Sequence, residues 1–89
     1  MFLDENKLSE IPEGVFNGCY NLWHLHLSNN ELTSITGLST VPALALLDLS
    51  DNKLTYNALF TLKEKNIIEI KLHGNSHLFE GFTEKVNEI

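Results

Sequence analysis

Three side-chain types in this 89-residue chain could do chemistry together, namely histidine, serine and aspartate. The residues concerned are His24, His26, Ser28, Asp48 and Ser50. An imidazole, a hydroxyl and a carboxylate are the groups of a hydrolase triad, and two imidazoles with a carboxylate are ligands that zinc accepts. The spacing of these residues implies neither a pocket nor oxyanion donors, which a hydrolase needs. It also fixes no further metal ligand, and Cys19 is the one cysteine in the sequence. We therefore expect no enzymatic activity, no metal site and no cofactor.

The charge balance argues against two classes of partner. The chain has 6 Lys and Arg against 12 Asp and Glu, a formal net charge of −6. Nucleic acids and anionic lipid surfaces are bound through clustered basic residues, so neither is expected as the main partner. No apolar run approaches the about 18 residues of a membrane span, so we expect no membrane insertion within this segment. A hydrophobic fraction of 43% is ordinary for one folded domain, here residues 1–89.

The chain contains an internal repeat, which its 16 Leu and 10 Asn already suggest. The pattern Leu-x-x-Leu-x-Leu-x-x-Asn-x-Leu fits windows that begin at Leu22 and Leu44, and a third that begins at Ile67 and has His77 in the last position. A truncated copy occupies residues 1–8. The asparagines of the four copies are Asn6, Asn30, Asn52 and Asn75, at intervals of 24, 22 and 23 residues. Four copies in one phase identify a repeat architecture.

This pattern resembles that of leucine-rich-repeat proteins and extends over residues 1–78. The resemblance implies a right-handed α/β solenoid of about 3.5 repeats, with a short parallel sheet on its concave side. The repeats are expected at about 1–21, 22–43, 44–66 and 67–78, and the strands near 1–4, 24–28, 46–50 and 69–73. The residues support this independently, because the alternating leucines lie on one strand face and are buried only when neighbouring repeats stack.

The four asparagines follow the strands, at the point where the chain turns out of the sheet. Turned inward, a side-chain amide can donate to and accept from backbone groups of its own turn and of the adjacent coil. Those backbone groups would otherwise be buried without a hydrogen bond. We therefore assign a structural role to Asn6, Asn30, Asn52 and Asn75.

The first crossover contains Ile11, Pro12, Gly14 and Phe16. It looks like the Leu-Pro-x-Gly-x-Phe segment of the repeat of about 24 residues that is typical of animal extracellular proteins and receptor ectodomains. Ile11, Phe16 and Cys19 are expected to point into the core, Cys19 as a small buried hydrophobic residue.

The later crossovers differ from the first. Apolar residues recur every three positions from Leu32 to Leu44, a spacing that suits 3₁₀ turns. This crossover resembles the shorter repeats of about 22 residues that also occur in intracellular proteins. The third crossover, residues 55–66, could hold a short helix. After Asn75 the apolar steps of three and four residues predict an amphipathic helix over residues 79–89 that covers the last coil.

The side chains between the leucines form the concave face, which usually meets the partner in this family. One predicted row across the strands is Phe2, His26, Asp48 and Lys71; a second is Asp4, Ser28, Ser50 and His73; a third is His24, Leu46 and Glu69. The candidate partner-binding residues are His24, His26, Ser28, Asp48, Ser50, Glu69, Lys71 and His73. Trp23 precedes a strand, and we expect it to pack over the neighbouring coil rather than to face a partner.

The chain begins inside a predicted strand, with no segment to cap the first coil. We therefore expect a fragment of a longer repeat array. If the chain stands alone, its open N-terminal end offers a surface for self-association.

The resemblance implies a protein–protein interaction module with a protein partner that the sequence does not name. The first crossover favours part of an extracellular protein, secreted or a receptor ectodomain, of the kind used in innate immunity or cell adhesion. The alternative is an intracellular, cytoplasmic scaffold or regulatory subunit. Free Cys19 and the absence of an Asn-x-Ser/Thr sequence favour that alternative.

Overall fold

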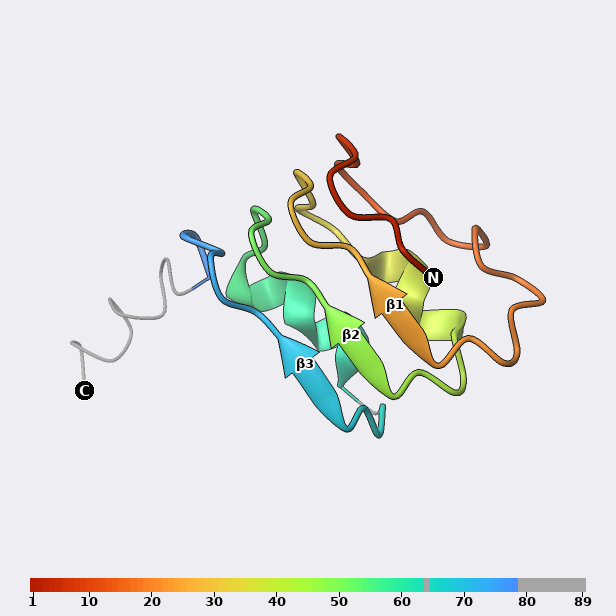
Figure 1. The fold of residues 1–89 in the computed structure, drawn as a ribbon. Helices are drawn as coiled ribbons and strands as arrows, with labels where there is room; N and C mark the ends of the chain where they lie inside the picture. The colour runs from red at the N-terminus through yellow and green to blue at the C-terminus, as the bar shows by residue number, and fades with distance from the viewer. Residues whose placement is uncertain (64, 79–89) are drawn as a thin grey trace, which may run out of the picture.

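The structure is a computed structural model, and it describes residues 1–63 and 65–78. The described elements, in chain order, are β1 (His24–His26), the 3₁₀ helix η1 (Thr36–Thr40), β2 (Leu46–Asp48), the 3₁₀ helix η2 (Tyr56–Leu62) and β3 (Glu69–Lys71). Figure 1 shows the three strands side by side on one face, with η1 and η2 behind them on the other. Each repeat therefore forms one coil, with a strand on the concave side and a crossover on the convex side.

The strands form one parallel sheet in the order β1-β2-β3. Leu25 pairs with Leu47, and Leu47 pairs with Ile70, so equivalent leucine positions of successive repeats lie side by side. The first coil joins the sheet through one isolated parallel bridge, between Phe2 and His26. The stacking of coils in one phase, which the sequence predicts, is confirmed.

The strands are shorter than predicted, three residues each instead of five. Side chains take over the hydrogen bonds that would extend them. The Ser50 amide donates to Oδ1 of Asp48 at 3.0 Å instead of to the neighbouring strand, and the Leu27 carbonyl accepts from Nδ2 of Asn52 at 3.0 Å. The predicted first strand, residues 1–4, is reduced to the bridge at Phe2, because the Ser28 amide donates to Oδ1 of Asp4 and the Leu3 carbonyl accepts from Nδ2 of Asn30.

The crossovers are built from tight turns. In η1 the Leu38 amide donates to the Ile35 carbonyl at 2.9 Å, and the Val41 amide donates to Leu38 at 3.2 Å. All three side chains are buried, which confirms the predicted three-residue spacing. The short helix expected in the third crossover is η2, also a 3₁₀ helix. The predicted solenoid of parallel strands joined by helical crossovers is confirmed in the described residues, whose helices are both 3₁₀, and the helix predicted over residues 79–89 lies outside them.

The first and second crossovers pack closely together at Gly37. Its amide donates to the Ile11 carbonyl at 2.7 Å, and a Cβ on Gly37 would lie 2.2 Å from the Pro12 carbonyl oxygen. Glycine is required here because no larger residue fits between the two backbones. Ile11 and Phe16 of the first crossover are buried as predicted, and Cys19 is half-buried against the core.

A single apolar core runs through the described coils. It contains Ile11, Phe16, Leu25, Leu27, Leu32, Ile35, Leu38, Val41, Leu44, Leu47, Leu49, Leu54, Leu62 and Leu78. The prediction for Trp23 is wrong, because 63% of this side chain is exposed. Its position precedes the strand, outside the alternation that turns side chains inward.

Buried asparagines join the coils where the strands end. The Asn52 side chain is 5% exposed and has four hydrogen bonds. Its Nδ2 donates to the carbonyls of Leu27, Leu49 and Ser50, each at 3.0 Å, and its Oδ1 accepts from the Leu32 amide at 3.0 Å. Two of these partners belong to its own turn and two to the preceding coil. Asn52 therefore joins its own turn to the preceding coil by hydrogen bonds.

The other asparagines repeat this arrangement. Oδ1 of Asn30 accepts from the Leu8 amide at 3.1 Å, and Oδ1 of Asn75 accepts from the Leu54 amide at 3.1 Å. Asn6 differs, because it is exposed and donates only within its own turn, to Leu3 and Asp4. Asn30, Asn52 and Asn75 therefore form a buried ladder, which we call the asparagine ladder, and Asn6 lies at its solvent-exposed end.

We predict that Asn52→Leu lowers the free energy of unfolding by roughly 1–3 kcal/mol, because it leaves buried backbone groups of two coils without hydrogen bonds. Asn6→Leu is the matched control and should cost less than about 0.5 kcal/mol, since water can replace its exposed bonds. Urea unfolding of both variants measures the difference. Equal losses for the two variants, or an unchanged midpoint for Asn52→Leu, would contradict a stabilising role for the ladder.

Candidate functional site

The sheet register assembles two of the predicted rows on the concave face. His24, Leu46 and Glu69 are paired neighbours, and so are His26, Asp48 and Lys71. Phe2 extends the row of His26, Asp48 and Lys71 through its bridge to His26. Neighbouring strands lie about 4.8 Å apart, so adjacent side chains of a row act as one surface. None of these rows is covered by another described element.

An aromatic pair forms the N-terminal end of this face. The Phe2 ring stacks on the His26 imidazole, with ring centroids 4.4 Å apart and an interplanar angle of 20°. Phe2 is nevertheless 77% exposed, whereas His26 is half-buried. A large apolar ring that is held in place and still faces solvent is a natural anchor for a protein partner, because aromatic residues are enriched at interfaces. The sequence places Phe2 in the row but gives no sign of the stacking.

Two carboxylates are held by serine side chains. Oδ1 of Asp4 accepts from the amide of Ser28 at 2.7 Å and from its hydroxyl at 2.9 Å. Oδ1 of Asp48 accepts from the amide of Ser50 at 3.0 Å and from its hydroxyl at 2.6 Å. Each serine donates its proton to a carboxylate, so neither hydroxyl is paired with a histidine base as a hydrolase nucleophile must be. Ser50 is 3% exposed, so it lies beneath the surface and holds the Asp48 carboxylate from below.

The Asp48 carboxylate lies in an environment with opposing effects. Burial alone would raise the pKa of Asp48, but the hydrogen bonds from the Ser50 hydroxyl and amide outweigh it, with smaller contributions from the charges of Lys71 and His26. The net result is a pKa of Asp48 below its ordinary value. Asp48 is therefore a carboxylate that stays ionised and fixed in orientation on the concave face.

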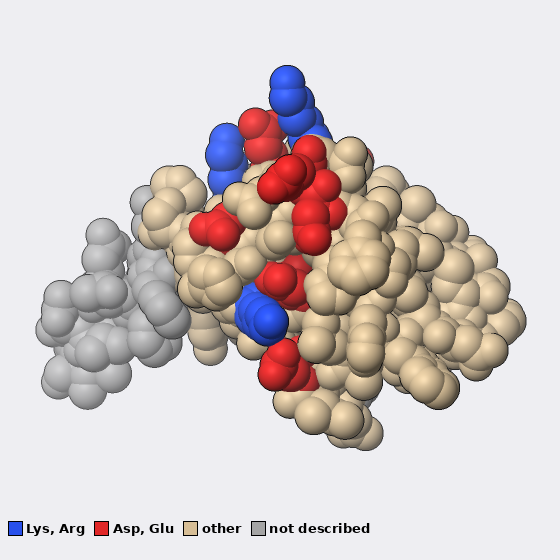
Figure 2. Space-filling model, in the orientation of Figure 1, with Lys and Arg blue, Asp and Glu red and all other residues tan. Residues whose placement is uncertain are grey.

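Charged side chains surround this carboxylate. Nζ of Lys71 lies 3.9 Å from Oε2 of Glu69, a long and exposed ion pair of small energy. Figure 2 shows that Asp and Glu side chains gather in a band across this face, with a lysine between them. The face thus combines an exposed aromatic end with a mainly acidic centre, and lysines lie beside the carboxylates at its upper edge in Figure 2.

The chain turns away from each strand through a residue with left-handed backbone. These residues are Glu5, Asn29, Asp51 and Gly74, with φ of 59°, 56°, 54° and 78°. Each immediately precedes an asparagine of the repeat pattern. The direction of the side chains at these positions is set by the turn and not by the sheet. The sequence pattern does not reveal the left-handed backbone of these residues.

Two further classes of site find no support in the described part of the chain. Within residues 1–63 and 65–78, no group of three His, Cys, Asp or Glu side chains is arranged to hold a metal ion. No helix in the same part of the chain is long and apolar enough to cross a membrane.

The lowered pKa of Asp48 predicts a pH dependence of stability. The stabilisation from its ionised form is complete above the pKa of the unfolded chain and is lost as the pH falls through the folded pKa. We expect Asp48→Asn to lose less stability than the unmodified chain between about pH 5 and about pH 2. Urea unfolding midpoints at both pH values measure this.

The matched control for this experiment is Asp51→Asn. Asp51 accepts no side-chain hydrogen bond among the described residues, and asparagine tolerates its left-handed backbone. Its pH dependence should follow that of the unmodified chain. Identical curves for Asp48→Asn and the unmodified chain would show that the Ser50 bonds do not stabilise the ionised carboxylate.

Comparison with known proteins adds to this geometry. Residues 1–54 match the family described as "Leucine rich repeat". An acidic leucine-rich nuclear phosphoprotein 32-related protein 1 from Caenorhabditis elegans is 38% identical over 71 residues, 80% of this chain and 31% of the relative. Human lumican is 47% identical over 57 residues, 61% of this chain and 17% of lumican.

A third relative is the rat leucine-rich repeat-containing G-protein coupled receptor 5, 36% identical over 78 residues, 85% of this chain and 8% of the receptor. The chain thus spans less than a third of each of these relatives. No solved structure is significantly similar to it. The family match over residues 1–54, together with parallel coils joined by buried asparagines, shows that the chain belongs to the leucine-rich-repeat family.

Proposed function

We propose that this chain is a protein-binding module that holds its partner on the concave face of the sheet. The observation that carries the proposal is the row Phe2, His26, Asp48 and Lys71, which runs across adjacent coils with exposed ends and with His26 and Asp48 half-buried between them. His24 and Glu69 flank this row in the paired strands, and Ser28 and His73 lie two residues beyond His26 and Lys71 in the chain. A parallel sheet normally has both faces covered, so an uncovered face in the described residues favours an interface.

The chemistry of the face favours a basic partner. The rows and the strand exits carry the carboxylates Asp4, Glu5, Asp48, Asp51 and Glu69, and Lys71 lies between carboxylates in the centre, with further lysines at the upper edge of the view in Figure 2. A partner with Lys or Arg beside an apolar or aromatic side chain would complement both the acidic centre and the Phe2 ring. Such complementarity speeds association and excludes partners of the wrong charge.

We place the module in an extracellular protein, secreted or a receptor ectodomain, of the innate-immunity or cell-adhesion type. The first crossover supports this, because Ile11 and Phe16 are buried as in the extracellular type of repeat. A receptor and lumican among the relatives also support it. The alternative is an intracellular scaffold or regulatory subunit. It draws support from the relative named a nuclear phosphoprotein and from Cys19, which is a free thiol.

Peptide phage selected on the immobilised chain test the concave face. We expect enrichment of Lys- and Arg-containing peptides whose binding falls about tenfold with Phe2→Ala, because truncating an aromatic anchor of an interface costs more than about 1 kcal/mol. Asp48→Asn and Lys71→Glu should change affinity in opposite directions, since they remove and add a negative charge. Val15→Ala, which truncates an exposed apolar side chain in the first crossover, is the matched control. Peptides that bind Phe2→Ala and Asp48→Asn as well as the unmodified chain would refute this site.

The compartment is tested with the full-length reading frame that contains this segment, expressed in cells with an epitope tag. Antibody labelling of intact cells or recovery from the medium is expected for the extracellular assignment. Labelling that requires permeabilised cells would favour the intracellular alternative.

A further inference from the structure

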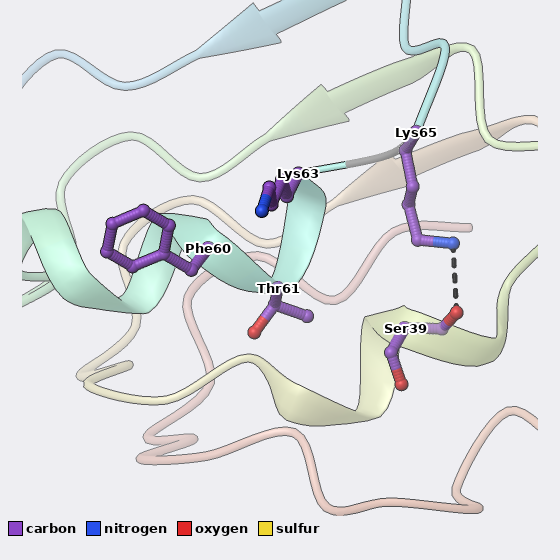
Figure 3. Close-up of a pocket in the computed structure, with 5 residues that line it drawn as sticks. All are labelled: Ser39, Phe60, Thr61, Lys63 and Lys65. Carbon is purple, nitrogen blue, oxygen red and sulfur yellow. Dashed lines mark hydrogen bonds between the residues drawn. The ribbon is translucent and has the colours of Figure 1, made fainter.

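The convex side of the coils carries a polar hollow that is separate from the rows of the concave face. A hollow of about 470 Å³ lies between the crossovers of two coils and is lined by Ser39, Phe60, Thr61, Lys63 and Lys65. We call it the convex hollow. It lies where η1 and η2 pack side by side, with the Lys65 side chain extending toward η1 (Figure 3). None of its lining residues belongs to the rows of the sheet.

Lys65 is fixed across the two coils. Its Nζ donates to the carbonyls of Ser39 at 3.1 Å and Val41 at 2.8 Å, and Figure 3 shows the first of these bonds at the edge of the hollow. Neutral carbonyls hold the ammonium without cancelling its charge. Because an ammonium has three donors, one remains for a ligand.

Lys63 adds a second cation to the same hollow. It is exposed, and the one ion pair within residues 1–63 and 65–78 joins Lys71 to Glu69, so no carboxylate described there neutralises Lys63 or Lys65. Glu64, which lies between the two lysines in the chain, is outside the described residues. The hollow therefore brings two lysine side chains together, neither of which has an ion-pair partner among residues 1–63 and 65–78.

The hollow also offers an apolar contact. Phe60 is 59% exposed and is held edge-to-face against Tyr56, with ring centroids 5.7 Å apart. A second hollow of about 270 Å³ shares Lys65 and is lined by Val41, Pro42, Ala43, Leu44, Ala45 and Asn66. Lysine and apolar side chains are therefore neighbours in two hollows that share Lys65.

We propose that the convex hollow binds an acidic peptide segment of a protein partner, in which a carboxylate side chain lies beside an apolar one. The carboxylate contacts Lys63 and the free donor of Lys65, and the apolar side chain lies against Phe60. An anionic membrane is a weaker match, because two lysines supply only about 2 kcal/mol of attraction and the net negative charge of the chain opposes it. This site lies on the face opposite to the concave rows, so it does not depend on the proposed function.

The test uses the full chain labelled with ¹⁵N and a capped heptapeptide, Gly-Asp-Asp-Phe-Asp-Asp-Gly, followed by NMR titration. We expect shifts of the backbone amides of residues 39–41 and 60–65. A peptide with Asn for Asp should bind more weakly because it loses the carboxylates that contact the lysines. A peptide with Ala for Phe should bind more weakly because it loses the apolar side chain that lies against Phe60. Shifts confined to the concave face, no shifts, or equal binding of the Asn peptide would overturn the proposal.

Matched variants separate the hollow from general effects of charge and surface. Lys63→Ser should weaken binding about two- to fivefold and Phe60→Ser about tenfold. Lys53→Ser and Ile68→Ser, which alter an exposed lysine and an exposed apolar residue outside the hollow, should leave affinity unchanged, as should Phe2→Ala. Equal losses with Lys53→Ser would indicate unspecific charge attraction. Binding to phosphatidylserine vesicles without binding to the peptide would assign the lysines to a lipid surface instead.

Discussion

The asparagine ladder is the interaction on which the rest of this structure depends. Leucines supply the driving force for stacking, but a coil must also turn out of the sheet, and that turn buries carbonyl and amide groups. Asn30, Asn52 and Asn75 each satisfy such groups in two successive coils at once. Because one side chain serves both coils, the turns are held in register, and the strands that lead into them are held in register too. The repeat length of 22 to 24 residues is the path from one such position to the next.

The ladder has direct consequences for the concave face. By accepting or donating in place of the neighbouring strand, asparagine and aspartate side chains end each strand after three residues. The orientation of side chains before the end of each strand is therefore set differently from that of side chains after it. Those within the strands form regular rows, as Phe2, His26, Asp48 and Lys71 do, whereas those at the turn are set by left-handed backbone. The serine bonds to Asp4 and Asp48 lie at this boundary and hold two carboxylates in place.

The two faces of the solenoid have different chemistry. The concave face is acidic with an aromatic end, and the convex hollow has two lysines beside an exposed phenylalanine. Membership of the leucine-rich-repeat family supports protein binding in general. It does not choose a compartment, since the relatives include a protein named as a nuclear phosphoprotein and one named as a receptor. A module with both faces in use would join a basic partner to an acidic one, and either compartment allows this.

The sequence by itself determined the repeat, the parallel stacking, the row membership of His26 and Asp48 and the structural role of the asparagines. These features follow from the spacing of the leucines and asparagines and from the need to bury them, and each repeat specifies both in its own residues. Only the tertiary structure decided that Asp48 is bonded to Ser50, that His26 stacks on Phe2, that Trp23 is exposed and that Lys65 crosses to Val41. Most of these contacts join different coils, and all involve surface side chains whose orientation is chosen by their neighbours. A periodic pattern reports which side chains turn inward, but it carries no information about the partners of those that turn outward.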